Sequence, residues 1–552
     1  MTQVTIDQAM RLAMAHHQAG RLQDAEAIYR QVLFAQPNHA QALHQMGVIA
    51  GRLGQFNLAV DLIGKAVSAS PDNADYHSDL GIARQSAGWL DEAIASYERA
   101  LSLRPVFAEA HYNLGAACKE TGQLDRAIAC YRRALEIRPG FVIAHDDLLN
   151  ALQCHPACDA RSLLAECQVW NRQHAQALSR SILPHPNNRD PMRPLRIGYV
   201  SSDFHNHVSA FFLLPLLRSH DSEQVQVFCY AQVAQGDAIT RQMQDHVPHW
   251  FSTVGMSDSQ LAEQIRRDQI DILVDLKLHT AGNRLLVFAS KPAPVQVTWL
   301  AYPGTTGLNT IDYRLTDPYL DPAGADEACY SERSIRLPDT FWCYDPLEDE
   351  LPVSASPCER NGSITFGCLN NFCKMNDRVI DLWANVLMAV PGSRLILMAP
   401  EGKSRSRVLE NLGRDGIGPD RVGFVARRPH LPYLHTYDGI DIVLDTFPYN
   451  GHTTSLDALW MGVPVITLVG NTVVGRAGLS QLTNLGLPEL VARSPEQYRQ
   501  IAVDLAGDLP RLAELRSTLR QRMQGSALMD APRFARGIEA AYRSMWRTWC
   551  ST

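Results

Sequence analysis

The first 150 residues carry a repeating pattern of small, apolar and turn-forming positions. A 34-residue period with glycine in the turn between two helices, alanine where the helices pack closely and proline after the second helix predicts stacked helical pairs. The three columns share one register: Gly20, Gly54, Gly88 and Gly122; Ala25, Ala59, Ala93 and Ala127; and Pro37, Pro71, Pro105 and Pro139. They predict four units, at residues 6–39, 40–73, 74–107 and 108–141, followed by a degenerate fifth.

Two further columns refine this prediction. Tyr29, Tyr97 and Tyr131 share an aromatic position, and Gly47, Gly81 and Gly115 share a small position on the first helix of their units. These columns are typical of tetratricopeptide (TPR) repeats, which stack into an α superhelix with a concave face.

One column of the repeats is polar and is expected to point toward the concave face. An amide or carboxylate ladder there binds the backbone of an extended peptide without reading its side chains. The alternative is a solvated inner face without a ligand. The candidate groove residues are Gln45, Asp79, Asn113 and Asp147.

After the repeats, short apolar runs rich in β-branched residues alternate with helical segments. A first set of strands is predicted at residues 196–200, 225–230, 272–274 and 295–299, and a second at 364–367, 395–398, 422–425, 442–444 and 463–467. Such buried parallel strands predict two doubly wound α/β lobes, which bind ligands at the strands' carboxyl ends. The predicted domains are 1–152 (repeats), 153–192 (a partly helical linker), 193–355 and 356–552 (the two lobes), with the break between the lobes in the linker-like stretch 351–357.

Composition excludes several classes of protein. Hydrophobic residues are 46% and charged residues 20%, as in globular proteins, and a net charge of −7 gives no electrostatic footprint for nucleic acid. No apolar run of membrane-spanning length occurs and residues 1–7 lack a leader pattern, so we predict a cytoplasmic protein that does not bind membranes. The twelve cysteines fit buried thiols of a reducing compartment.

Sequence patterns for metal and nucleotide cofactors are weak. Cys154 and Cys158 have no second pair at zinc-finger spacing, and the pair His205 and His207 has no apparent third ligand. No Asp-x-Asp or Gly-x-Gly-x-x-Gly occurs, and residues 470–477 have P-loop glycine spacing without its Lys-Ser/Thr. We therefore predict no metal and no cofactor.

The segment 445–460 is the most informative for chemistry. It contains a strand end, a turn with Asn-Gly-His at 450–452, two threonines and then a helix. Free N–H groups at a helix start bind anions, and the Thr453 and Thr454 hydroxyls add donors, so a diphosphate suits this site. The alternative is plain capping by a Thr454–Asp457 capping box. Capping does not need the preceding Asn-Gly-His run, which favours the anion site.

Three other segments follow predicted strands and are expected to face the cleft. Lys374, with Asn371 beside it, offers a mobile positive charge to a departing phosphate. His207 lies at a helix start, where the positive dipole end favours a neutral ring that accepts a proton. The turn at 302–307, which includes Pro303 and Gly304, allows the backbone to approach a sugar closely.

Taken in order, residues 197–204 (Ile-Gly-Tyr-Val-Ser-Ser-Asp-Phe), 302–307 (Tyr-Pro-Gly-Thr-Thr-Gly), Lys374 and 450–454 (Asn-Gly-His-Thr-Thr) resemble the O-linked N-acetylglucosamine transferases, bacterial members in particular. The resemblance covers nearly the whole chain. It implies a GT-B fold and an inverting, metal-independent glycosyltransferase that moves N-acetylglucosamine from UDP-N-acetylglucosamine (UDP-GlcNAc) to serine or threonine hydroxyls of proteins held by the repeats.

The resemblance also implies roles for individual residues. His207 matches the family's proposed base, and Lys374 with Asn371 its diphosphate-binding pair. Phosphate and sugar contacts are implied for His452, Thr453 and Thr454, a ribose contact for Asp457, and nucleoside contacts for Arg428 and Tyr433.

Tyr449 differs from the animal enzymes, which have a smaller cysteine at this position. The sequence Asp-Thr-Phe-Pro-Tyr at 445–449 also resembles SPINDLY-type O-fucosyltransferases. UDP-glucose or GDP-fucose is therefore an alternative donor. A TPR scaffold with a non-catalytic cleft is the alternative from another class.

Overall fold

The computed structural model describes residues 5–325, 327–347 and 351–552. It contains two compact units: Met1–Ala144 with Pro400–Arg407, and His145–Ala399 with Val408–Thr552. Residues 1–4, part of the segment examined for a leader, and residues 326 and 348–350 lie outside the described structure.

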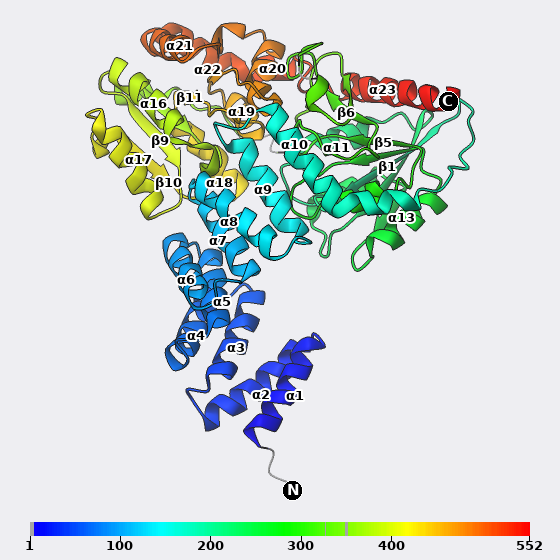
Figure 1. Ribbon diagram of the computed structural model, residues 1–552. Helices are drawn as coiled ribbons and strands as arrows, with labels where there is room; N and C mark the ends of the chain where they lie inside the picture. Colours follow the sequence, from blue (N-terminus) through cyan, green and yellow to red (C-terminus); the bar gives the residue numbers. More distant parts are fainter. Residues whose placement is uncertain (1–4, 326, 348–350) are drawn as a thin grey trace. The chain divides into compact units, whose positions relative to one another are not determined.

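The first unit is built of antiparallel helical pairs, shown in blue in Figure 1. Each of the four predicted units contains one pair, so this part of the fold prediction is confirmed. The pairs are α1 Ile6–Gln18 and α2 Leu22–Ala35, α3 Ala40–Arg52 and α4 Phe56–Ala69, α5 Ala74–Ser86 and α6 Leu90–Leu103, and α7 Ala108–Glu120 and α8 Leu124–Ile137. A further helix, α9 Val142–Cys154, begins the degenerate fifth unit.

The recurring residues have separate physical causes. Gly20, Gly54, Gly88 and Gly122 all have φ between 73° and 84°, a left-handed conformation that favours glycine after a helix. Ala25, Ala59, Ala93 and Ala127 are fully buried between helices. Gly81 and Gly115 lie against the rings of Tyr97 and Tyr131, where a Cβ would overlap the ring. The aromatic and small columns are therefore two sides of one contact.

Replacing Gly81 with alanine is expected to destabilise the α5–α6 pair by about 1–3 kcal/mol, because the added methyl group overpacks the Tyr97 contact. Gly64 in α4 is the matched control, since a Cβ there meets open space. Gly64→Ala should stabilise its helix by about 0.8–1 kcal/mol. Hydrogen exchange of the α5 and α6 amides measures the first effect, and unchanged protection in Gly81→Ala would contradict it.

The second unit contains two parallel sheets. The first has the order β3-β2-β1-β4-β5-β6-β7 and the second β10-β9-β8-β11-β12-β13, which confirms the two predicted α/β lobes. The strands are β1 Leu195–Ser201, β2 Val225–Ala231, β3 His249–Ser252, β4 Ile272–Asp275, β5 Val295–Thr298, β6 Tyr313–Thr316, β7 Arg333–Arg336, β8 Thr365–Cys368, β9 Arg394–Met398, β10 Val422–Val425, β11 Ile442–Leu444, β12 Val465–Leu468 and β13 Val491–Ala492.

Helices accompany these strands along the chain, and α10 occupies part of the predicted linker. They are α10 Ala160–Trp170, α11 Ala210–Ser219, α12 Ala238–Asp245, α13 Asp258–Arg267, α14 Leu285–Ala289, α15 Pro357–Asn361, α16 Asp377–Ala389, α17 Lys403–Arg414, α18 His430–Leu434, α19 Thr453–Trp460, α20 Ala477–Asn484, α21 Pro495–Gly507, α22 Leu509–Gln524 and α23 Ala531–Ser551.

The last helix corrects the predicted lobe boundary. The sequence assigned 356–552 to the second lobe, but α23 packs on the first, as the red helix beside β5 in Figure 1 shows. The ring of Phe534 lies 5.8 Å from that of Trp299 in the centroid distance, and the Tyr542 hydroxyl lies 3.2 Å from that of Tyr199. The amphipathic face of α23 thus completes the first lobe's core, a pairing that sequence order does not reveal.

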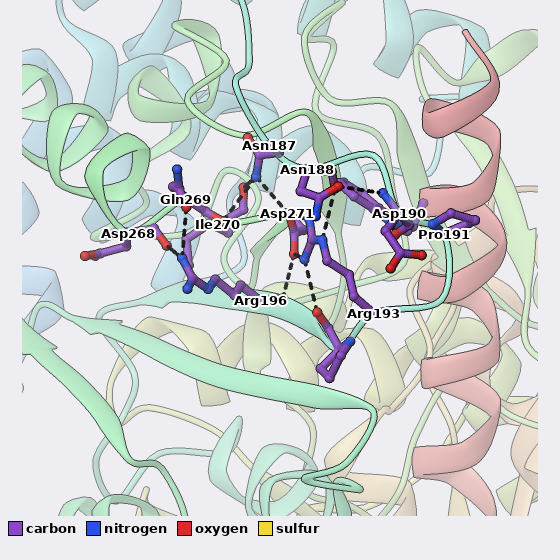
Figure 2. A network of polar contacts seen from close by, with 12 residues as sticks. Asn187, Asn188, Asp190, Pro191, Arg193, Arg196, Asp268, Gln269, Ile270 and Asp271 are labelled. Carbon is purple, nitrogen blue, oxygen red and sulfur yellow. Dashed lines mark hydrogen bonds and ion pairs between the residues drawn. The ribbon is translucent and has the colours of Figure 1, made fainter.

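The first lobe begins where a buried carboxylate anchors the incoming chain (Figure 2). Asp271, just before β4, accepts two hydrogen bonds from the Arg193 guanidinium, at 2.7 and 2.6 Å. It also accepts from the Arg196 amide and the Asn187 side chain, both at 2.8 Å. This network fixes the amino ends of β1 and β4, so their opposite ends carry the loops of the candidate site.

Candidate active site

Both sheets have a topological switch point, where the strand order reverses between the central strand and its neighbour. In the first sheet this place lies between β1 and β4, and in the second between β8 and β11. Ligands of doubly wound sheets bind in the crevice outside the carboxyl ends of such strands. The loops that follow these strands, at 202–209, 276–283, 369–376 and 445–452, contain His207 and Lys374 and lead to the start of α19.

Side chains join the two lobes near these loops. The ring of Trp342 lies 5.4 Å from that of His452, and the ring of Phe211 lies 4.8 Å from that of His430, both as centroid distances. Arg427, which follows β10, acts electrostatically on His207 in the first lobe. The candidate base is therefore within electrostatic range of the second lobe.

The amino end of α19 has no side-chain cap. The helix begins at Thr453 with His452 as the residue before it, and within the described part of the chain no side-chain cap accepts its first amide hydrogens. The Thr454 hydroxyl donates to Asn370 Oδ1, and the Asp457 carboxylate accepts from the Tyr344 hydroxyl at 2.7 Å. The capping-box alternative is therefore wrong, and the amides at this helix start keep their capacity to bind an anion.

A buried carboxylate shapes the turn before α19. Asp445 Oδ1 accepts hydrogen bonds from the amides of Thr446 at 2.8 Å and Gly451 at 2.6 Å. Asn370 Nδ2 donates to the same oxygen at 3.1 Å, which ties the loop after β8 to the loop after β11. Burial raises the pKa of Asp445 to about 6, and the surrounding donors lower it in part.

Lys374 lies over this turn. Its Nζ donates to the Asn450 carbonyl at 2.8 Å and sits 3.8 Å from the centroid of the Tyr449 ring. Burial lowers its pKa. Burial and the Lys374 charge lower the pKa of His452 to about 3, so this imidazole is neutral at physiological pH. A lysine ammonium group thus lies close to a neutral ring, while Asn371 is exposed on the same loop as the lysine.

His207 lies in the loop after β1, half-buried, with Nδ1 3.2 Å from Asp203 Oδ2 and 3.1 Å from the Ser209 hydroxyl. The Ser209 amide nitrogen is also 3.2 Å from Nδ1. Desolvation lowers the pKa of His207, Asp203 raises it, and Lys277, His205 and Arg427 lower it. Together these groups favour the neutral ring. In the tautomer with the proton on Nδ1, shared with Asp203, Nε2 is the nitrogen left to accept a proton.

The other predicted donor contacts come from both lobes, and Asp457 lies on α19 itself. Pro303 and Gly304 are buried, and the Gly304 carbonyl accepts from Arg314 Nε at 2.9 Å. Arg428 is exposed after β10, and the Tyr433 hydroxyl lies 2.9 Å from that of Tyr437. Burial raises the pKa of Asp457 to about 7. Their roles in donor binding stay predictions.

In the repeat unit, Gln45 and Asp79 line one pocket of about 390 Å³. Asp79 pairs there with His44, Oδ2 to Nε2 at 2.6 Å. Asn113 occupies the corresponding place on α7, while Asp147 on α9 belongs to the second unit. The peptide groove stays a prediction. Two of its four residues, Gln45 and Asp79, line the same pocket.

Sequence reasoning missed four polar side chains of the site: Asp203, Lys277, Asn370 and Asp445. Each is buried and lies at or just after the carboxyl end of a strand at a switch point. A charged residue inside an apolar run, as in the Leu276, Lys277, Leu278 sequence, is the signal that marks such a position.

Among the described residues, no group of three or more His, Cys, Asp or Glu side chains is arranged to hold a metal ion. Within the same ranges, no helix has the length and apolar character needed to cross a membrane.

Residues 169–348 and 358–538 match the sequence profile of glycosyl transferase family 41. The chain belongs to this family. TPR profiles match residues 5–33, 40–73, 84–122 and 108–141, in agreement with the helical pairs. The family 41 profile thus covers both sheets and the loops described above.

Named relatives carry related descriptions. The probable UDP-N-acetylglucosamine–peptide N-acetylglucosaminyltransferase SPINDLY of Arabidopsis thaliana is 42% identical over 375 residues, covering 66% of this chain and 41% of the relative. The UDP-N-acetylglucosamine–peptide N-acetylglucosaminyltransferase of Caenorhabditis elegans is 26% identical over 496 residues, covering 68% and 43%. The chain spans about two fifths of the length of these curated relatives.

A solved structure of a Thermobaculum terrenum O-GlcNAc transferase mutant is similar over nearly the whole chain. Its TM-score is 0.85 at 38% identity, and the match covers 93% of this chain and 98% of the other. The order of repeats followed by two parallel sheets therefore matches the fold of this O-GlcNAc transferase structure over nearly its whole length.

Proposed function

We propose that this family 41 chain is a protein O-glycosyltransferase that moves a sugar, N-acetylglucosamine in the first instance, from a nucleoside diphosphate donor to serine or threonine hydroxyls. The observation that carries this proposal is the amino end of α19, which has no side-chain cap and follows the turn covered by Lys374. Helix amides and a mobile ammonium group together suit the diphosphate of a nucleotide sugar.

In this proposal the acceptor hydroxyl attacks the anomeric carbon from the side opposite the phosphate. The new C–O bond forms as the bond to the phosphate oxygen breaks, so the configuration inverts and the nucleoside diphosphate leaves. His207 accepts the hydroxyl proton. Lys374 and the amides of Thr453 and Thr454 stabilise the charge that develops on the leaving group. Asn371, His452 and Asp457, with Arg428, Tyr433, Pro303 and Gly304, are the proposed contacts to the rest of the donor.

The positive charge for this step comes from the chain itself, so the proposal requires neither a metal ion nor a cofactor. Transfer is expected to persist in EDTA. The polar column of the repeats, Gln45, Asp79, Asn113 and Asp147, is the proposed guide for the acceptor protein, and the pocket at Gln45 and Asp79 supports it.

Tyr449 supports a second candidate for the donor sugar. The Tyr449 ring lies directly under the Lys374 ammonium and fills space beside the proposed diphosphate site. A bulky ring there favours a donor without an acetamido group, such as UDP-glucose or GDP-fucose.

The direct test is incubation of the protein with acceptor proteins and each of UDP-GlcNAc, UDP-glucose and GDP-fucose in EDTA, followed by mass spectrometry. A mass increment of N-acetylhexosamine on serine or threonine supports the leading proposal, and a hexose or deoxyhexose increment supports the second. No transfer from any donor, together with no calorimetric heat on titration with UDP, would identify a scaffold.

A further inference from the structure

A buried lysine in the first lobe lies next to the candidate base. Lys277 Nζ is 2.6 Å from Asp203 Oδ2, and the two residues are only 5% and 7% exposed. The same Asp203 oxygen is 3.2 Å from His207 Nδ1. One carboxylate oxygen is thus shared between a lysine on one side and a histidine ring on the other.

We propose that Lys277 is a positioning residue that neutralises Asp203 and thereby keeps the His207 ring in the neutral, proton-accepting form. The proposal rests on the proposed role of His207 as the base. It assigns Lys277 no contact with donor or acceptor, because its described partner is the buried Asp203 carboxylate.

The backbone at Lys277 is built to hold this arrangement. The Asp275 carboxylate accepts from the amides of Lys277 at 3.1 Å and Leu278 at 3.0 Å, and from the Thr298 hydroxyl at 2.8 Å. Leu278 has a φ of 42°, a left-handed conformation that costs a non-glycine residue about 1–2 kcal/mol. Strain directly after Lys277 indicates that the surrounding contacts fix the direction in which the chain leaves β4.

The Asp203 side is equally fixed. The Asp203 amide donates to the Ser201 hydroxyl at 2.9 Å, and the Ser202 side chain packs against Gly282, where a Cβ would come within 2.6 Å of the Ser202 hydroxyl oxygen. The loops after β1 and β4 therefore meet at the Ser202–Gly282 contact as well as at the Lys277–Asp203 pair. This contact needs a glycine at position 282.

The electrostatic reason for the lysine follows from the groups around His207. Asp203, His205 on the same loop, Lys277 after β4 and Arg427 after β10 all act on the ring. An unpaired buried carboxylate next to an imidazole stabilises the imidazolium, which has no lone pair to accept a proton. Lys277 offsets that attraction, so Asp203 contacts Nδ1 without charging the ring.

The test is Lys277→Met, which keeps the aliphatic stem and removes the charge. Without Lys277, the negative charge of Asp203, 3.2 Å from His207 Nδ1, is no longer offset and favours the imidazolium. A nearby opposite charge shifts a pKa by about 1–3 units. Because the half-exposed His207 ring is partly screened, its pKa is expected to rise by about 1 unit. The acid limb of the pH profile of kcat/KM should move to higher pH by the same amount. The titration is read by NMR on the His207 ring, assigned with His207→Gln.

Three variants control for charge, for folding and for position in the lobe. Lys277→Arg retains the charge and should leave the His207 titration near its original midpoint. The double variant Asp203→Asn with Lys277→Met removes both charges and should return the midpoint toward the original value even if Lys277→Met folds poorly. Lys291→Met, which breaks the separate Lys291–Asp312 pair in the same lobe, should not move it.

An unchanged His207 midpoint in folded Lys277→Met, or a midpoint that moves equally in Lys291→Met, would overturn the proposal. A midpoint that rises while the pH profile of transfer stays fixed would support the role of Lys277 and overturn the role of His207 as base. The two proposals therefore fail in distinguishable ways.

Discussion

Lys374→Met is expected to reduce sugar transfer by about 10²–10³-fold, the loss typical of removing one preorganised group that stabilises developing negative charge. The effect should appear in kcat and in kcat/KM, because the charge on the leaving diphosphate is greater in the transition state than in the bound donor. Methionine retains most of the aliphatic stem and removes the ammonium group, which lies over the Tyr449 ring and donates to the Asn450 carbonyl.

The same variant is expected to lose no more than about 1 kcal/mol of folding free energy, the usual net value of one hydrogen bond. Lys65→Met on α4 is the control, because Lys65 is exposed and pairs with Asp61 four residues earlier on the same helix. It should leave both transfer and melting temperature unchanged. Full transfer by Lys374→Met, or a large loss of melting temperature, would show that this lysine is structural.

Arg314→Met is expected to cause the largest loss of stability, about 3 kcal/mol, because it leaves a buried carboxylate without its main partner. Arg314 is 1% exposed and Asp321 0% exposed, with Nη1 and Oδ2 2.6 Å apart. We expect the lower end of the range for a broken buried pair because Arg336 lies 3.9 Å from the same oxygen. Urea unfolding of the second unit measures the loss.

A second ion pair in the same unit supplies the comparison. Arg533 and Asp339 form two hydrogen bonds, at 2.8 and 2.7 Å, but the Arg533 side chain is largely exposed. Arg533→Met should therefore cost less than about 1 kcal/mol. Equal losses in the two variants would contradict the claim that burial makes the Arg314 pair important.

The repeats were predictable because each column reflects a local requirement that returns every 34 residues. Gly54 has a positive φ, and Gly81 faces the ring of Tyr97. Each of these local requirements selects glycine at its own position, so the sequence shows it directly. The central strands were predictable for a related reason: Ile272–Asp275 and Val465–Leu468 are buried at every position, and their sequences are mostly apolar and β-branched.

The strands β3, β6, β7 and β13 were not predicted. β3 and β7 lie at an edge of the first sheet and are partly exposed, so they lack a continuous apolar run. β6 is fully buried but contains Arg314, whose charge is balanced by Asp321 seven residues later. β13 has only two residues. The packing of α23 on the first lobe was missed because it depends on tertiary contacts between distant segments.

The candidate site shows the same division. Lys374, Thr453 and Thr454 lie after strands, as their sequence positions predicted, and their roles stay predictions. Lys277 and Asp203 lie on two different loops, 74 residues apart in the sequence. Their 2.6 Å contact forms only in the folded chain, so the sequence does not show that they pair. Single residues at strand ends are therefore recoverable from sequence, whereas charge pairs across a switch point are not.

The central claim is that protein groups alone hold the diphosphate of the donor. A crystal structure of the chain with UDP, obtained once in EDTA and once with manganese, tests it most directly. The account predicts the diphosphate between Lys374 Nζ and the amides of Thr453 and Thr454 in both crystals, with no bridging ion. UDP bound elsewhere, or phosphates ordered only through a divalent cation, would contradict it.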